Sequence, residues 1–208
     1  GMNRVRINET GDLCIREGKH PLLMAQLKDG VIDSVEPLDL VLEKKRKVMI
    51  ITGPNAGGKT IAIKTAGLLV LMALSGMPVP AHGATSLPLV KKILVDIGDD
   101  QSIESAQSTF SAHVMRISDI IDRSDANSLV LLDEVGTGTE PLQGAAIACG
   151  VLKELKERGA IVLATTHLTD IVAFVQKGEG MMNASMAFDR ESHRPLYRLK
   201  EGEPGESH

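Results

Sequence analysis

Residues 53–60 have the types and the spacing needed to bind phosphate groups. They read Gly-Pro-Asn-Ala-Gly-Gly-Lys-Thr, a full match to the pattern GxxxxGK[ST]. Such glycines permit a backbone turn whose successive N–H groups surround an anion. Lys59 is then expected to reach the β- and γ-phosphates of a nucleotide, and the Thr60 hydroxyl to ligate Mg²⁺. The residues predicted to contact ATP here are Gly53, Pro54, Asn55, Ala56, Gly57, Gly58, Lys59, Thr60 and Ile61.

Two acidic residues follow the apolar stretch 129–132, which reads Leu-Val-Leu-Leu. Two carboxylates at the end of a buried strand are costly unless a cation lies nearby. Asp133 is therefore expected to hold Mg²⁺, directly or through water. Glu134 is expected to orient the attacking water and act as its general base. An acidic pair after a strand is also common in surface loops, so this assignment depends on the phosphate-binding segment.

A histidine follows a further apolar stretch, in the sequence Thr165-Thr166-His167. Ligands of open α/β sheets bind at the carboxyl ends of the strands. We therefore expect His167 to hydrogen-bond the γ-phosphate and to respond to its loss. A structural or exposed role is expected for the remaining histidines apart from His20, namely His82, His113, His193 and His208.

The elements that must position these residues alternate between short strands and longer helices, which is typical of a parallel α/β sheet. Strands are predicted at 48–52, 93–97, 129–132 and 160–165, and helices at 59–74 and 141–158. A strand before 53–60 and a helix after it argue against a chance glycine-rich turn. Residues 4–42 contain only short strand candidates, and 181–199 look like two strands joined by a polar turn. Both ends therefore predict a small antiparallel β layer beside the parallel sheet.

We expect a single domain over 1–208. Residues 1–2 look like a tag remnant, 3–45 an N-terminal β subregion, 46–180 the phosphate-binding core, and 181–208 a β hairpin with a truncated tail. No segment is long and apolar enough to span a membrane, and no cleavable signal is visible. Cys14 and Cys149 are far apart in the chain and have no metal-ligand spacing, which indicates reduced, buried thiols in a cytoplasmic protein.

The composition and the net charge indicate whether this chain is suited to contact DNA. Hydrophobic residues make up 43% and charged residues 24% of the 208 residues, which is typical of a globular domain. The net charge is −4, whereas a surface that binds DNA phosphates is usually basic. Any DNA contact is therefore expected from domains outside this chain. The one basic cluster, Lys44 to Lys47, is interpreted as a solvated hairpin turn and not as a phosphate-binding patch.

The motifs together resemble the ATPase domain of the MutS family. The resemblance rests on GPNAGGKT at 53–60, Ser-Thr-Phe at 108–110, DEVGTGT at 133–139 and Thr-Thr-His at 165–167, in this order. GKHPLL at 18–23 matches the motif just upstream of the family's ATPase core. The strings Asp-Ile-Gly-Asp-Asp-Gln at 96–101, STFSAH at 108–113 and NASMAFD look closest to a bacterial paralogue branch. That branch is associated with suppression of recombination and with rescue of collided ribosomes, instead of mismatch correction.

The resemblance implies an ABC-type ATPase that works as a homodimer, with ATP as substrate and Mg²⁺ as cofactor. Ser108 matches the family's signature segment and is expected to contact the γ-phosphate bound by the partner subunit. Physically, Ser108-Thr109 is a good N-cap for a helix with Phe110, Val114, Ile117 and Ile121 on one face. The family stacks adenine on aromatic or imidazole groups, for which Tyr197 and His20 are the candidates. The segment 135–140 resembles the part of the family that lies along the dimer interface.

Two alternatives remain. One is the ATPase head of another ABC-type DNA-maintenance protein, although the interval 60–129 has no room for the long coiled-coil insertion of such proteins. The other is a nucleotide-gated dimerisation scaffold with little hydrolysis, against which the presence of Glu134 argues. A transporter motor is disfavoured because no LSGGQ string occurs.

Overall fold

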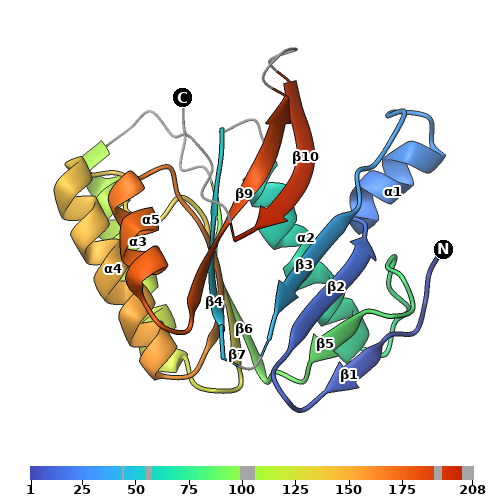
Figure 1. Ribbon diagram of the computed structural model, residues 1–208, viewed down its shortest axis with the longest axis horizontal. Helices are drawn as coiled ribbons and strands as arrows, with labels where there is room; N and C mark the ends of the chain where they lie inside the picture. The colour runs from blue at the N-terminus through green and yellow to red at the C-terminus, as the bar shows by residue number, and fades with distance from the viewer. Residues whose placement is uncertain (44, 55–57, 99–105, 190–193, 203–208) are drawn as a thin grey trace.

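The computed structural model describes residues 1–43, 45–54, 58–98, 106–189 and 194–202 (Figure 1). Its elements, in chain order, are β1 (Arg6–Asn8), β2 (Leu13–Gly18), α1 (Pro21–Lys28), β3 (Leu38–Leu42), β4 (Val48–Thr52), α2 (Lys59–Leu74), β5 (Ser86–Pro88), β6 (Lys92–Asp96), α3 (Ala106–Arg123), β7 (Ser128–Leu132), α4 (Pro141–Glu157), β8 (Ile161–Thr165), α5 (Thr169–Lys177), β9 (Met181–Asp189) and β10 (Arg194–Glu201). No described helix combines the length and apolarity that a bilayer crossing requires.

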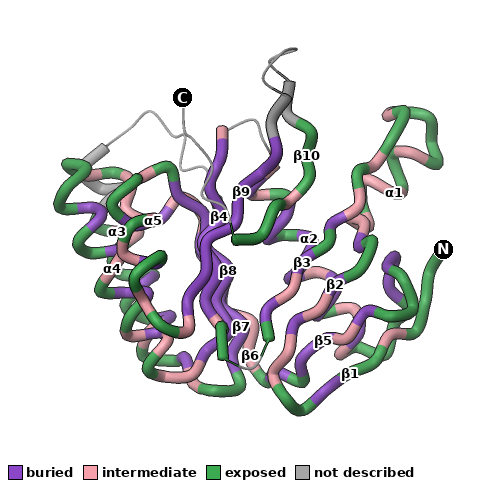
Figure 2. The backbone as a smooth tube through the Cα atoms, viewed as in Figure 1, coloured by how far each residue is buried: buried purple, intermediate pink, exposed green. Residues whose placement is uncertain are grey.

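A six-stranded sheet forms the centre of the molecule, in the order β10-β9-β4-β8-β7-β6. Neighbouring strands from β9 to β6 are parallel, and only β10 runs antiparallel to its neighbour. Strands β4, β7 and β8 are buried along their whole length (Figure 2). Strands covered on both faces lack an alternating pattern, which is why 48–52, 129–132 and 160–165 are continuous apolar runs in the sequence.

Helices cover both faces of this sheet. Figure 1 shows α3, α4 and α5 on one face and α2 on the other. Helix α2 lies between the six-stranded sheet and a smaller four-stranded sheet of order β1-β5-β2-β3. Both sheets contribute to one apolar cluster with α2, including Ile15, Leu40, Ile51, Leu69 and Leu131. Because α2 is buried on opposite sides, its sequence is apolar nearly all round.

The structure corrects several expectations for the ends of the chain. The region 4–42 contains a helix, α1, that we did not predict; it is short and has no buried residue, so it shows no helical period, although Pro21 at its first turn is a helix-start signal. The small sheet is mixed, because β1 and β5 are parallel. The predicted C-terminal hairpin is confirmed, but β9 joins the main sheet beside β4 instead of forming a separate layer.

Three local expectations were also wrong. Lys45 and Arg46 are exposed in a turn, but β3 and β4 on either side belong to different sheets and form no hairpin. Both cysteines are free but only half-buried. Of the face predicted for α3, Ile117 is buried and Ile121 packs against the core as expected, but Val114 is 38% exposed.

Candidate active site

The phosphate-binding segment lies between β4 and α2, as predicted. Gly58 precedes the helix with φ of 89°, a left-handed conformation that favours glycine. Lys59 is only 3% exposed. Its Nζ donates hydrogen bonds to the carbonyl oxygens of Gly53 at 2.7 Å and Pro54 at 3.0 Å. The ammonium of the lysine therefore lies against the first two residues of the loop, while the predicted contacts at 55–57 fall outside the described residues.

The Lys59 ammonium is in an electrostatically unusual place. Burial lowers its pKa below the usual lysine value, and the nearby carboxylates of Glu134 and Asp133 act in the opposite direction. A buried cation gains from an added anion, because the anion replaces the lost hydration. This region is therefore suited to a polyanion such as a phosphate chain.

The structure brings Thr60 and Asp133 together although 73 residues separate them in the chain. The Thr60 hydroxyl donates to Asp133 Oδ2 at 2.7 Å, and the Thr165 hydroxyl donates to Asp133 Oδ1. The Asp133 backbone N–H donates to the carbonyl of Asp96 at 2.9 Å. Two hydroxyls thus hold the Asp133 carboxylate and one carbonyl holds its backbone, so three other elements fix this residue at the carboxyl edge of the sheet. No role was predicted for Thr165, and the only feature of the sequence that pointed to one is a hydroxyl at the end of an apolar strand.

A hydroxyl and a carboxylate oxygen are suitable ligands for Mg²⁺, which usually takes one or two protein oxygens and completes its shell with water and substrate phosphates. Within the described residues, no three acidic, histidine or cysteine side chains form a metal-binding group. Thr60 and Asp133 therefore fit a metal shared with a phosphate chain, and a site built from protein side chains alone does not fit the described part of the chain.

Glu134 has an unusual backbone conformation. Its φ is 50°, a left-handed value that is uncommon for residues other than glycine. Its N–H donates to Thr165 Oγ1 at 2.8 Å, and its carbonyl accepts from the Thr137 hydroxyl at 2.8 Å. Hydrogen bonds on both sides thus hold a conformation that an unconstrained glutamate avoids. Strained backbone of this kind concentrates at functional sites.

His167 follows β8 at the same edge of the sheet and is exposed. Thr166 before it is buried, donates to the carbonyl of Val135 at 3.2 Å and accepts from the N–H of Leu168 at 3.1 Å. The backbone on both sides of His167 is therefore fixed while the imidazole stays accessible. Asp133, Glu134 and His167 all lie where neighbouring parallel strands β7 and β8 end, as expected.

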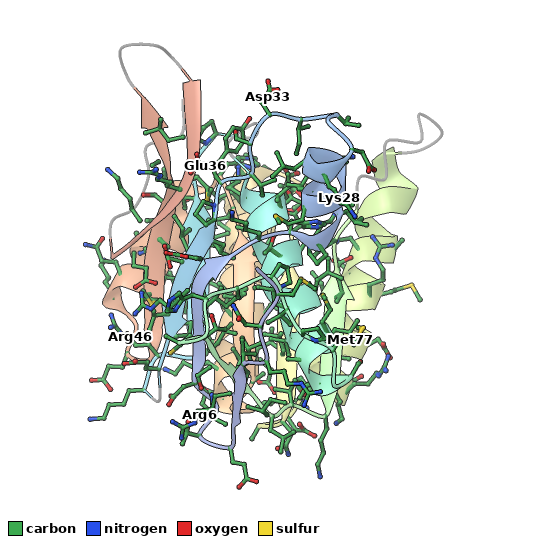
Figure 3. All side chains as sticks on the ribbon, turned by 90° about the vertical axis from the view of Figure 1, so that its right-hand side faces the viewer. Arg6, Lys28, Asp33, Glu36, Arg46 and Met77 are labelled. Atoms are coloured by element: carbon green, nitrogen blue, oxygen red, sulfur yellow. The ribbon has the colours of Figure 1, made fainter. Side chains whose placement is uncertain are left out.

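A cavity of about 360 Å³ lies beside the phosphate-binding segment. It is lined by both predicted base contacts, Tyr197 and His20, and by Gly58 and Ile61. Tyr197 lies where the β9–β10 register shifts, with φ of 54°. Its ring is so close to Gly58 that a β-carbon there would lie 2.9 Å from Cδ1. Glu36 and Met186 also line the cavity and were not predicted from the sequence. Figure 3 shows Glu36 on the segment after α1.

Ser108 is part of helix α3, which begins by Ala106. The expectation that Ser108-Thr109 caps this helix was therefore wrong, because both residues are already helical. Helix α3 packs on the face of the sheet opposite to α2 (Figure 1). A contact between Ser108 and a phosphate chain is thus not expected within one chain, and its proposed partner site remains a prediction.

The fold and the site define an α/β domain with a glycine-rich segment between a strand and a helix, and a carboxylate–hydroxyl pair at one edge of the sheet. The description "MutS domain V" matches residues 49–208. The match covers most of the chain, which therefore belongs to the MutS family, as the motifs predict.

Comparison with similar proteins indicates which branch of the family this chain resembles. The chain is 46% identical over 201 residues to "Endonuclease MutS2" of Halalkalibacterium halodurans, covering 97% of this chain and 25% of that protein. A protein of the same description from Clostridium botulinum strain Loch Maree is 45% identical over the same shares. One from Lachnospira eligens is 46% identical over 99% of this chain and 25% of its own length. These relatives support the bacterial paralogue branch, and this chain spans about a quarter of their length.

Proposed function

We propose that this chain is a Mg²⁺-dependent ATPase domain whose two copies enclose two ATP molecules. Lys59 and the loop 53–60 bind the phosphate chain. Thr60 and Asp133 hold Mg²⁺, which neutralises charge on the phosphates when bound. Glu134 takes the proton of the attacking water, and His167 hydrogen-bonds the γ-phosphate.

The single observation that carries this proposal is the 2.7 Å contact between Thr60 and Asp133. It joins the helix that follows the glycine-rich loop to the end of β7. The two candidate metal ligands are thus within bonding reach of one ion beside a buried lysine. A glycine-rich turn formed for structural reasons would not need an acidic residue from another strand at that point.

The base is proposed to occupy the cavity lined by Tyr197, His20 and Ile61. A cavity of about 360 Å³ is at the lower end of the range typical of small-molecule sites. The Tyr197 ring offers a stacking face, and it lies against Gly58, next to the phosphates. The surface of the cavity is mostly apolar, although His20, Ser34 and Glu36 are part of its lining, so most of the affinity is expected from the phosphate chain.

In the full-length protein, ATP binding and hydrolysis are proposed to switch a homodimer between two arrangements of a DNA clamp formed by other domains. The net charge of −4 favours DNA contacts outside this chain. The proposed role of the full-length protein is DNA repair or control of recombination in the cytoplasm, with nucleoid association, on the basis of the motifs that resemble the bacterial paralogue branch. No membrane partner is proposed.

Replacing Glu134 by Gln tests the chemistry. Glu134→Gln keeps the shape of the side chain but removes the base, so ATP binding should persist while phosphate release falls by about 100-fold or more. ATP with Mg²⁺ should also convert this variant from monomer to dimer in sedimentation experiments. Glu154→Gln, on the surface of α4, is the matched control and should behave like the parent chain. Unchanged turnover in Glu134→Gln would exclude Glu134 as the base, and no ATP binding by the parent chain would refute the proposed function.

A further inference from the structure

Asp96 and His113, to which the proposed function gives no role, meet in the structure. Asp96 is the last residue of β6, and its side chain is 6% exposed. Its Oδ2 lies 2.6 Å from Nδ1 of His113. Its Oδ1 accepts a hydrogen bond from Nε of Arg116 at 2.9 Å. A nearly buried carboxylate thus joins the edge of the sheet to the imidazole of His113 and the guanidinium of Arg116 on α3.

These contacts matter because of how α3 is held on the sheet. From residue 111 onward, the first buried apolar side chains of the helix are Ile117 and Ile120, which are 8% and 5% exposed. From residue 111 to residue 116 no side chain is buried, and Met115 is 73% exposed. Among the described side chains, His113 and Arg116 therefore join this part of α3 to the edge of the sheet. The N-terminal half of the helix, to which His113 belongs, also contains Ser108.

Asp96 also acts on the candidate metal site through its backbone. Its carbonyl oxygen accepts from the N–H of Asp133 at 2.9 Å. On the other side, His113 shares a small cavity with Val135, Gly136 and Thr137, the segment that follows Glu134. The Asp96–His113 pair is thus connected both to the carboxyl end of β7 and to the loop after the proposed base.

We propose that Asp96 and His113 are positioning residues, which hold the N-terminal half of α3 at the angle needed to contact a nucleotide bound by a second copy of the chain. The inference rests on the proposed function and adds to it which residues orient the helix. A charge-assisted contact to a buried carboxylate is directional and strong. It therefore sets the helix position more tightly than exposed apolar residues do.

The first test compares two substitutions of His113. His113→Leu keeps the volume but loses the contact with Asp96, whereas the amide nitrogen of His113→Asn occupies a place similar to Nδ1 and still donates. His113→Leu should lower kcat for ATP by about tenfold while KM changes less than about twofold. The residues of each chain that bind its own ATP are unchanged, and only the contact supplied by the helix of the other chain is lost. His113→Asn should restore most of kcat. Asp96→Asn, which keeps the backbone carbonyl, is the second variant and should resemble His113→Leu.

The second test mixes variants. In a mixed dimer of His113→Leu and Glu134→Gln chains, one site combines an intact base with an intact helix. Mixing equal amounts of two nearly inactive chains should therefore restore about a quarter of the parent turnover, because half of the dimers are mixed and each has one competent site. If His113 acted on its own chain's site, mixing would restore nothing.

Asp119→Asn provides the matched control. Asp119 forms an exposed ion pair with Arg123 on the same helix, so its loss should leave kcat and KM unchanged. Parent-like kcat in His113→Leu, or failure of the mixture to recover, overturns the positioning role while leaving the ATPase proposal intact. A parent chain that neither binds nor hydrolyses ATP refutes the proposed function and this inference together.

Discussion

At the scale of residues, the site is built by side chains that have more than one task. Lys59 contacts the carbonyl of Gly53 and brings a positive charge to the loop, and Thr165 holds both the carboxylate of Asp133 and the N–H of Glu134. Such sharing fixes the geometry before a ligand binds. Preorganised groups of this kind lose less free energy on binding than groups that must first be ordered.

Loss of the Lys59 ammonium should weaken ATP binding. Lys59→Met removes a charge-assisted contact but leaves an apolar side chain in a buried position, so the fold should persist. We expect the Kd for ATP to rise about 10- to 100-fold, measured by calorimetry. Lys91→Met, at an exposed position away from the site, should bind ATP like the parent chain. Equal ATP affinity in both variants would contradict the role of Lys59.

Tyr197 should affect the base and not the phosphates. Tyr197→Ala removes the ring beside Gly58, and the loss of an aromatic stacking contact is expected to raise the Kd for ATP by about 2- to 12-fold. Inorganic triphosphate has no base, so its affinity should not change. Tyr197→Phe retains the ring and serves as the control. An equal loss for both ligands would mean that Tyr197 acts through the loop and not through the base.

At the scale of elements, the loop after Glu134 depends on close packing against α4. Gly136 has φ of 85°. A β-carbon at Gly144 would lie only 1.9 Å from the carbonyl oxygen of Gly136. Helix α4 begins under this loop, where the Glu140 side chain accepts from the N–H of Gln143. The bare backbone of Gly144 is thus what permits the loop and the helix to approach each other.

Substitution at Gly144 should disturb the site through this contact. Gly144→Ala must push the loop and helix α4 away from each other. We expect a loss of about 1–3 kcal/mol in unfolding free energy together with reduced ATP turnover. Nothing lies within 4 Å of a β-carbon at Gly150 on the same helix. Gly150→Ala should therefore stabilise the chain by about 0.5–1 kcal/mol. Urea unfolding measures both values, and equal effects at the two positions would refute the packing argument.

At the scale of the whole molecule, α2 links the two sheets. Leu69 is fully buried in the cluster shared by both sheets. A β-carbon at Gly18 on β2 would lie 2.8 Å from Cδ1 of Leu69. The hairpin β9–β10 also connects the two sheets, because the N–H of Val41 donates to Glu201 and Arg198 forms an ion pair with Glu36. The sheets are therefore expected to unfold together, and the first turn of α2 carries Lys59 and Thr60, which are proposed to bind phosphate and Mg²⁺.

Truncation of Leu69 tests this coupling. Leu69→Ala should lower the unfolding free energy by about 2–5 kcal/mol. Amide exchange should then accelerate in both β2 and β4, because one cluster supports both strands. The exposed Leu71, on the same helix, supplies the control Leu71→Ala, which should have little effect. Faster exchange in β2 alone would mean that the small sheet unfolds independently.

The sequence determined the central strands, α2, α4 and the order of the motifs. Continuous apolar runs ending in polar residues predict buried strands with functional ends, and this local pattern survives folding in β4, β7 and β8. Short elements were less predictable: α1 has too few residues to show a period, and the capping expected at Ser108 failed because the helix extends further back.

Only the tertiary structure decided which distant residues meet. The approach of Thr60 to Asp133, the ring of Tyr197 beside Gly58 and the pairing of Asp96 with His113 all join separate elements. His113 belongs to the string STFSAH but was expected only to be structural or exposed, because a single histidine on a helix has no pattern of its own. The motifs specify which chemical groups are available, whereas strand order and helix packing set their distances, which depend on contacts between residues far apart in the chain.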